Sequence, residues 1–293
     1  MFFKVILCFN QYSSLFFFYE LKLACAKSKK IPAGILIVLL EWINDSGSES
    51  LKIAMIRVGV DAGCGGIQGP LFKDGSFEFI PIPENSDMTS KHTFGSLIGR
   101  HRKPLSDYFP PRRRENVALM GVHNDPDWTN FTYGTYTGSS QSNLQYLEKG
   151  DFLIFTCGLQ GWYFDCEPAI YLIGYFKVKT AGRYSDFTRS DIKSLFDDND
   201  HVWRIKSRQE AITEDGRELL LVKGSSKSRL LKKAVRLSIT TKDKKGRPLK
   251  VLSPRMQKIM GDFGGRISIQ RCPARWIDPQ YVSRTAEFLQ SLK

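Results

Sequence analysis

The chain has 293 residues, of which 42% are hydrophobic and 25% are charged. This composition is that of a globular protein and excludes an intrinsically disordered one. The formal net charge is +13, and the basic excess lies in the last third, where residues 201–293 carry 22 Lys and Arg against 8 Asp and Glu. Such a segment suits a polyanionic partner such as nucleic acid, and it equally suits a solvated lysine-rich surface.

The six cysteines give no sign of a metal-binding or disulfide framework. No two of them form a C-x-x-C pair, and nothing in their spacing requires disulfides. We therefore expect a cytoplasmic protein. The cysteines are Cys8, Cys25, Cys64, Cys157, Cys166 and Cys272.

The first 54 residues differ in character from the rest of the chain. They contain a Phe-rich piece, a basic patch and an apolar run over residues 35–40, and these apolar runs are too short to span a bilayer. Polar residues 10–14 interrupt the apolar core that a signal peptide needs. We therefore expect residues 1–54 to be a non-native extension, the true start to be Met55, and one domain to cover residues 55–293 without a membrane anchor.

A glycine-rich loop follows the first predicted strand, which covers residues 56–61. Gly63, Gly65 and Gly66 come directly after Asp61. The loop does not fit the G-x-G-x-x-G fingerprint, and no Lys-Ser/Thr pair follows it as in a P-loop. Glycine lets backbone N–H groups approach a ligand, so the loop favours a site for an anion or a base; the simpler alternative is a structural turn.

The remaining pattern predicts more strands than helices in the first two thirds of the chain. Asp74-Gly75 between apolar runs predicts a hairpin. The fold class is therefore α+β, with a mixed, mostly antiparallel sheet or small barrel, flanking helices and a basic, helical last third. Strands are predicted over residues 117–122, 152–156, 169–178 and 217–224, and helices over residues 191–196, 228–238, from 254 to about 264, and 277–292.

Three polar side chains follow the strand predicted over residues 117–122. His123, Asp125 and Asp127 can act in general acid–base catalysis or bind a metal. His123-x-Asp125 also resembles the first two ligands of Fe(II)/2-oxoglutarate oxygenases, which need a distal histidine, and His201 is the one histidine that follows. Asp125-Pro126-Asp127 is equally a simple turn. The residues alone leave the metal and any cofactor undetermined.

Aromatic residues gather in the loops between the predicted strands. Tyr133 lies in one such group near the polar Gln141, and Trp162 lies in another. An extruded or single-stranded base is commonly held by stacking on aromatic rings, so we take these three residues as candidates for nucleotide binding. The alternative is that the rings belong to the hydrophobic core.

A basic, serine-containing loop precedes the helix predicted over residues 228–238. Lys223, Lys227 and Arg229 flank Ser225 and Ser226. Backbone N–H groups at a helix N-terminus, together with cations, favour phosphate. The loop is therefore a candidate phosphate contact, with a capped, solvated loop as the alternative.

Several of these motifs occur in one order. Together, residues 57–66, Pro81-Ile82-Pro83, His123-x-Asp125-Pro126-Asp127 and Leu147-x-x-Gly150-Asp151-x-x-x-Phe155 resemble the nucleotide modification associated domain family, third type, from about Ile56 to the C-terminus. The Gly-Asp strand unit is also similar to base-recognising PUA-like barrels. The resemblance implies a role with modified DNA bases in phages and prokaryotes, and places a site at Asp61, Gly65, Gly66, His123, Asp125 and Asp127.

The leading hypothesis is therefore a domain that handles modified nucleotides in DNA, by binding or by processing them. The first alternative is an enzyme that makes or removes the base modification, with Asp61, His123, Asp125 and Asp127 as catalytic groups. The second alternative is a basic structural partner of a modification complex. The expected partners are DNA or nucleotides, and other DNA-modification proteins. The sequence does not decide between enzyme and binding domain.

Overall fold

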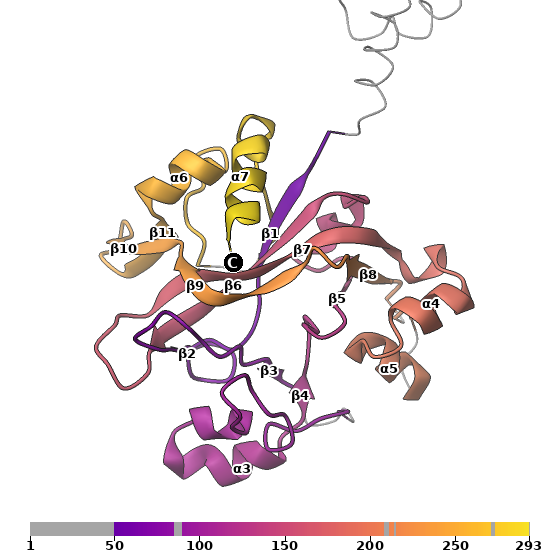
Figure 1. The fold of residues 1–293 in the computed structure, drawn as a ribbon, viewed down its shortest axis with the longest axis horizontal. Coiled ribbons are helices and arrows are strands. Elements are labelled where there is room, and N and C mark those ends of the chain that lie inside the picture. Colours follow the sequence, from indigo (N-terminus) through magenta and orange to yellow (C-terminus); the bar gives the residue numbers. More distant parts are fainter. Residues whose placement is uncertain (1–49, 85–89, 208–210, 214, 271–272, 293) are drawn as a thin grey trace, which may run out of the picture. The chain divides into compact units, whose positions relative to one another are not determined.

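The computed structural model describes residues 50–84, 90–207, 211–213, 215–270 and 273–292 (Figure 1). One compact unit runs from Leu51 to Lys293. Its first strand, β1 (Ile53–Arg57), begins before Met55. The start at Met55 stays a prediction, while the folded unit takes in residues that precede it.

An eight-stranded mixed sheet forms the centre of this unit (Figure 1). Its strands run in the order β12-β1-β6-β7-β8-β5, with β2 beside β6 and β9 beside β7. β1 and β2 pair with β6 in parallel, and the other pairs are antiparallel. The predicted α+β class with a mostly antiparallel sheet is confirmed, and the sheet is open. The strands after β1 are β2 (Gly69–Leu71), β5 (Thr132–Tyr136), β6 (Phe152–Gly161), β7 (Ala169–Arg183), β8 (Leu219–Gly224), β9 (Arg229–Arg236) and β12 (Arg275–Trp276).

The two long central strands, β6 and β7, were both predicted from uninterrupted apolar runs. The first eight residues of each strand are buried, because other elements cover both faces of the sheet there. The Asp151 carboxylate fixes the turn into β6 by accepting hydrogen bonds from the backbone N–H groups of Lys52 (2.8 Å) and Glu148 (2.9 Å). These contacts tie the start of β1 to the start of β6.

Short helices flank the sheet at both ends. In Figure 1, α6 and α7 lie over the part of the sheet that contains β1, and α4 and α5 lie beyond β8. The predicted helices near residues 191, 254 and 277 are confirmed. Among the described residues no helix is long and apolar enough to cross a membrane. The helices are α3 (Arg114–Leu119), α4 (Arg189–Leu195), α5 (Asp200–Ser207), α6 (Pro254–Met260) and α7 (Pro279–Ser291), with 3-10 turns at Leu105–Tyr108, Pro111–Arg113, Ser142–Tyr146 and Tyr184–Asp186.

The helix predicted over residues 228–238 is wrong, because these residues form strand β9. β9 pairs with β7 at Gly174↔Leu230 and again at Leu172↔Val235. Between these two pairs the chain advances by five residues in β9 and by only two in β7. This bulge breaks the alternation of a regular strand and leaves apolar residues at spacings that imitate a helix. The loop at residues 223–229 therefore joins two strands and precedes no helix N-terminus.

The strand predicted over residues 117–122 is also wrong for most of its length. Helix α3 (Arg114–Leu119) covers its first half, and of the predicted strand only Val122 belongs to a strand, β4 (Val122–His123). β4 pairs antiparallel with β3 (Ile82–Pro83), where Ile82 lies opposite His123. A separate hairpin forms from β10 (Ser238–Lys242) and β11 (Pro248–Leu252). The small β3–β4 ladder matters because it positions the polar cluster described next.

Candidate functional site

A buried polar cluster forms where the β3–β4 ladder meets helix α5. His123 is the last residue of β4, and Asp125 follows it. His201 and Arg204 lie on α5, whose first residue is Asp200. Glu84 directly follows β3 and completes the cluster. None of these six residues lies in a long strand, and tertiary packing brings them together.

His123, Asp125 and His201 form a group of potential metal ligands within this cluster. Each offers one ligand atom, and the three atoms lie within 4.8 Å of one another. Nε2 of His201 lies 3.5 Å from Oδ2 of Asp125. The two imidazole rings meet edge to face, with centroids 4.7 Å apart and planes at 89°. The exposed side-chain fractions are 13% for His123, 2% for Asp125 and 8% for His201.

Strand β5 holds two of these side chains in place through Gly134. Its backbone N–H donates hydrogen bonds to both carboxylate oxygens of Asp125, at 3.1 and 3.2 Å. A Cβ atom on Gly134 would lie 2.5 Å from Cδ2 of His201, so the imidazole occupies the space of a side chain. Tyr136 also packs against His201, with ring centroids 5.6 Å apart. The cluster therefore depends on a glycine at position 134.

Arg204 connects the histidines to the surrounding carboxylates. Its guanidinium contacts both the Glu84 carboxylate and Nδ1 of His123. The same Nδ1 lies 3.9 Å from carboxylate oxygens of Glu84 and Asp200. Asp200 also accepts a hydrogen bond from the backbone N–H of Asn124 at 2.5 Å. Acidic and basic groups thus share a volume from which most water is excluded.

Burial shifts the protonation of this cluster. It lowers the pKa of His123 well below the ordinary value, and the nearby His201 and Arg204 lower it further. It raises the pKa of Asp125 and of Asp200, because a buried carboxylate is poorly solvated. His123 is therefore a neutral imidazole at neutral pH. Shifts in these directions, caused by desolvation at a cluster of ionisable groups, are common at functional sites and also occur in structural ion networks.

The third residue of the sequence motif, Asp127, has a different environment. Its carboxylate accepts hydrogen bonds from the backbone N–H of Thr129 (2.8 Å) and from Nδ2 of Asn130 (2.9 Å). Its backbone exchanges hydrogen bonds with Thr132 at the start of β5. Asp127 therefore caps the turn before β5, and it is outside the group of three ligand atoms.

Asp61 is engaged within the glycine loop. One carboxylate oxygen accepts from the backbone N–H groups of Gly63 (2.7 Å) and Cys64 (2.8 Å), and the other lies 3.0 Å from the Arg57 guanidinium. The N–H of Gly66 donates to the Asp61 carbonyl. Asp61 thus occupies the place that a bound anion would take, and these partners all lie outside the His123 cluster.

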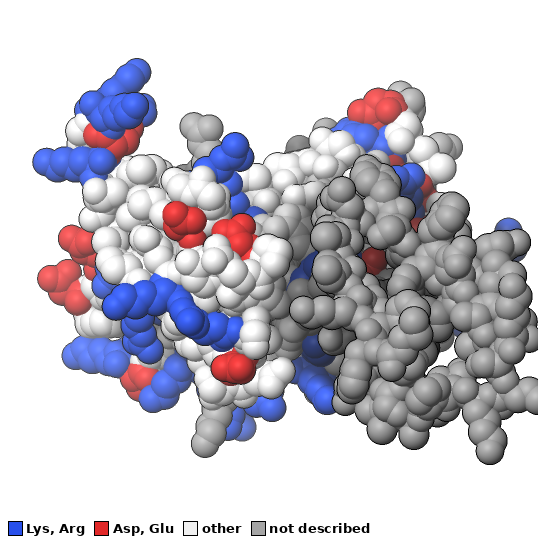
Figure 2. Space-filling view, turned by 90° about the horizontal axis from the view of Figure 1, so that it is seen from above, with Lys and Arg blue, Asp and Glu red and all other residues white. Residues whose placement is uncertain are grey.

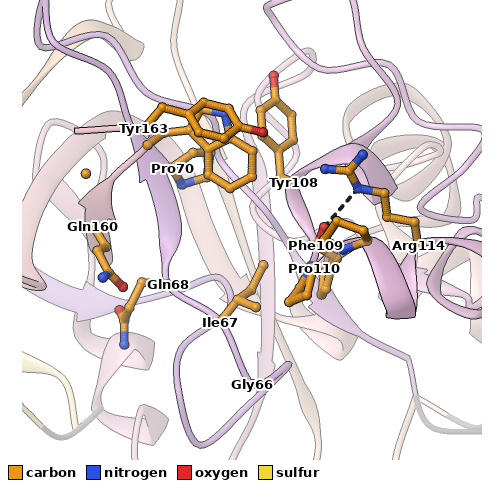
Figure 3. A pocket seen from close by; sticks show the side chains of 13 residues that line it. Gly66, Ile67, Gln68, Pro70, Tyr108, Phe109, Pro110, Arg114, Gln160 and Tyr163 are labelled. Carbon is orange, nitrogen blue, oxygen red and sulfur yellow. Dashed lines mark hydrogen bonds between the residues drawn. The ribbon is translucent and has the colours of Figure 1, made fainter. Parts of the chain in front are cut away.

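An aromatic cleft of about 490 Å³ lies next to the glycine loop (Figure 3). Tyr163 is 83% exposed, and its ring contacts Trp162, which in turn contacts Tyr108. In Figure 3, Gln68 and Gln160 lie on the opposite side of the cleft from Arg114. The cleft also contains Gly66, Ile67, Pro70, Phe109, Pro110, Pro111 and Gly161. Of the predicted nucleotide-binding residues, Gly66 and Trp162 line it.

The other predicted nucleotide-binding residues lie elsewhere. Tyr133 is buried in the core against Phe155, and its hydroxyl contacts the side-chain amide of Gln141. Nζ of Lys223 donates to the Asn130 carbonyl at 2.6 Å. Lys227, Arg229 and Gly63 are exposed, and Gly65 is partly exposed. The structure therefore distributes the predicted set over the core, the loop, the cleft and the surface.

Some residues of the cluster could not be found from the sequence. His201 carried a signal, because it is the one histidine downstream of His123-x-Asp125. Glu84, Asp200 and Arg204 carried none, because an isolated charged residue in a loop or short helix looks like ordinary surface. The same holds for Tyr163, since nothing in its local sequence separates an exposed ring from a buried one.

Taken together, the open mixed sheet, the aromatic cleft and the buried His–Asp cluster define an α+β domain with two sites of unusual chemistry. The model of the family "Nucleotide modification associated domain 3" matches residues 52–291. The chain belongs to this family, as the ordered motifs had indicated. Searches of curated proteins and of solved structures found no match.

Proposed function

We propose that the domain handles a modified nucleotide in a DNA-modification system, and that the aromatic cleft receives the base. The observation that carries the proposal is the exposure of Tyr163, a residue that is 83% exposed and whose ring lies against Trp162. A base stacks on such rings irrespective of its sequence context, and stacking contributes about 1–3 kcal/mol per base. Membership of the nucleotide modification associated family supports the same ligand class.

The backbone at Tyr163 adds to this argument. Its φ is +59°, a left-handed conformation that costs a bulky residue about 1–3 kcal/mol. Such conformations cluster at ligand-binding sites. Here the conformation keeps a large apolar ring out of the core and over the cleft. The feature therefore supports a ring held ready for a planar ligand.

The polar residues of the cleft suit the remaining parts of a nucleotide. The side-chain amides of Gln68 and Gln160 can donate to and accept from base edges. Arg114 lines the other side, and Arg113 donates to the Gly65 carbonyl at 3.2 Å. One guanidinium group can donate two parallel hydrogen bonds to two oxygens of the same phosphate. We assign phosphate to these arginines, because Asp61 already uses the N–H groups of the glycine loop.

An enzyme that makes or removes the modification is the second candidate. The buried cluster around His123 and Asp125 favours it, because perturbed acid–base groups are typical of active sites. The basic structural partner has less support. On the face in Figure 2, Lys and Arg side chains lie among acidic and uncharged ones, so the charge by itself does not single out this alternative.

In the experiment, the full chain is titrated with plain and with base-modified deoxynucleoside monophosphates, and the binding affinity is measured by calorimetry. Tyr163→Ala should weaken binding about 5- to 100-fold, the loss of one stacking contact. Tyr146→Ala is the matched control, since Tyr146 is 61% exposed and lies outside the cleft. Equal affinity of the two variants would refute the cleft as the base site. Nucleoside analysis of the same mixtures separates binding from turnover.

A further inference from the structure

We propose that His123, Asp125 and His201 bind one divalent transition-metal ion. Two imidazoles and one carboxylate form the protein donor set of catalytic zinc sites and of non-heme iron(II) sites. Both kinds of site keep further positions open for water or substrate. The inference is independent of the nucleotide cleft, because none of the three residues lines that cleft.

The first argument is the unsatisfied imidazole of His201. The residue is 6% exposed, and neither ring nitrogen has a hydrogen-bond partner among the described residues. Leaving a buried polar group unpaired costs about 1–3 kcal/mol, so such groups are rare. Nε2 lies 3.5 Å from an oxygen of Asp125, too far for a good hydrogen bond. A metal ion between the two atoms would satisfy both.

The second argument is the charge of the cluster. Glu84, Asp125 and Asp200 place three carboxylates around the two imidazoles, and Arg204 contacts that of Glu84. Buried charges are normally paired or bound to metal. A divalent cation would offset the negative charge that these carboxylates carry when ionised; the competing explanation is that protons on the buried carboxylates remove it.

The third argument is geometric. Metal–ligand bonds of 2.0–2.2 Å place neighbouring ligand atoms about 3–3.5 Å apart. Asp125 and His201 are already at this separation, and the whole group lies within 4.8 Å, so an inward shift of about 1 Å completes the site.

The test uses the full chain, stripped with a chelator and titrated with Zn²⁺ and with Co²⁺. We expect one equivalent of either ion to bind, a rise in melting temperature, and visible Co²⁺ absorption of a site with nitrogen and oxygen ligands. Asp125→Asn keeps the side-chain shape, and His201→Asn removes the second imidazole. Each should weaken binding about 100-fold or more and abolish the Co²⁺ spectrum.

His101→Asn is the matched control, because His101 is a histidine beside a carboxylate, Glu78, outside the cluster. It should bind as the unmodified chain does. Binding that survives in both Asp125→Asn and His201→Asn would overturn the proposal, as would no binding of either ion to the unmodified chain, which would leave protons as the neutralising charge. Should His201→Asn fail to fold, Asp125→Asn alone decides, since its hydrogen bonds from Gly134 can persist.

Discussion

The start of β1 allows a quantitative test of where the folded unit begins. Ile53 and Ala54 are fully buried, and they pair with Phe152 and Leu153 of β6. The Ile53 carbonyl accepts a hydrogen bond from Ile277 at 2.9 Å. We compare a chain that begins at Leu51 with one that begins at Met55. The second lacks all of these contacts.

The expected loss follows from these contacts. Removing a buried isoleucine side chain costs about 2–5 kcal/mol. Three hydrogen bonds, two at Lys52 and one at Ile53, add about 1 kcal/mol each. The total of about 5–8 kcal/mol is a large part of the 5–15 kcal/mol that stabilises a typical domain. The chain from Met55 should therefore melt at least about 10 °C lower, or without a cooperative transition.

The assay is thermal unfolding followed by circular dichroism. The chain from Leu51 should melt like the full chain. Ile53→Val in that shorter chain is the graded control and should cost about 0.5–1.5 kcal/mol. If the chains from Leu51 and Met55 melt within about 2 °C of each other, the argument from burial is refuted, and Met55 is a sufficient start for the fold.

Three further predictions concern the cluster and the basic surface. Gly134→Ala should displace His201 and weaken metal binding, measured by Co²⁺ titration, whereas Gly63→Ala, whose added Cβ would meet Asp61 at 3.3 Å, should not. If Lys227 and Arg229 contact DNA phosphates, replacing both with alanine should flatten the plot of log K against log salt by up to about two units; an unchanged slope leaves them as solvated surface. Because burial lowers the pKa of His123, the unfolded chain takes up a proton that the folded chain does not as the pH falls below about 6.5, so in the metal-free chain His123 contributes a loss of stability on acidification, which the raised pKa of Asp125 and of Asp200 opposes. A denaturant melt at several pH values checks this, and His123→Gln should remove that part of the pH dependence.

The sequence predicted the parts of the fold that are determined locally. β6 and β7 are long apolar runs, which only a sheet covered on both faces accommodates. Helix α6 begins at Pro254, and the hydroxyl of the preceding Ser253 accepts from the Met256 N–H as an N-cap. β9 was missed because its bulge against β7 is set by a partner strand far away in the sequence.

The same division holds for the candidate sites. His123-x-Asp125 was predicted as a site because the two side chains are close in sequence. Glu84 and Arg204 reach them through the β3–β4 ladder and helix α5. No local sequence pattern predicts that these elements meet. Asp61 illustrates the opposite case, since its position beside glycines suggested a ligand site while its carboxylate is satisfied by Arg57 and loop N–H groups.

The position of β1 in the sheet has a consequence for biosynthesis. β1 is among the first described residues of the chain, yet it lies between β6 and β12, and Ala54 pairs with both Leu153 and Trp276. During translation β1 has no partner strand in this sheet until β6 leaves the ribosome, and its second edge stays open until β12 follows. Such long-range pairing folds slowly and exposes the nascent chain to aggregation. Overexpression at low temperature or with added chaperones should therefore increase the yield of folded protein.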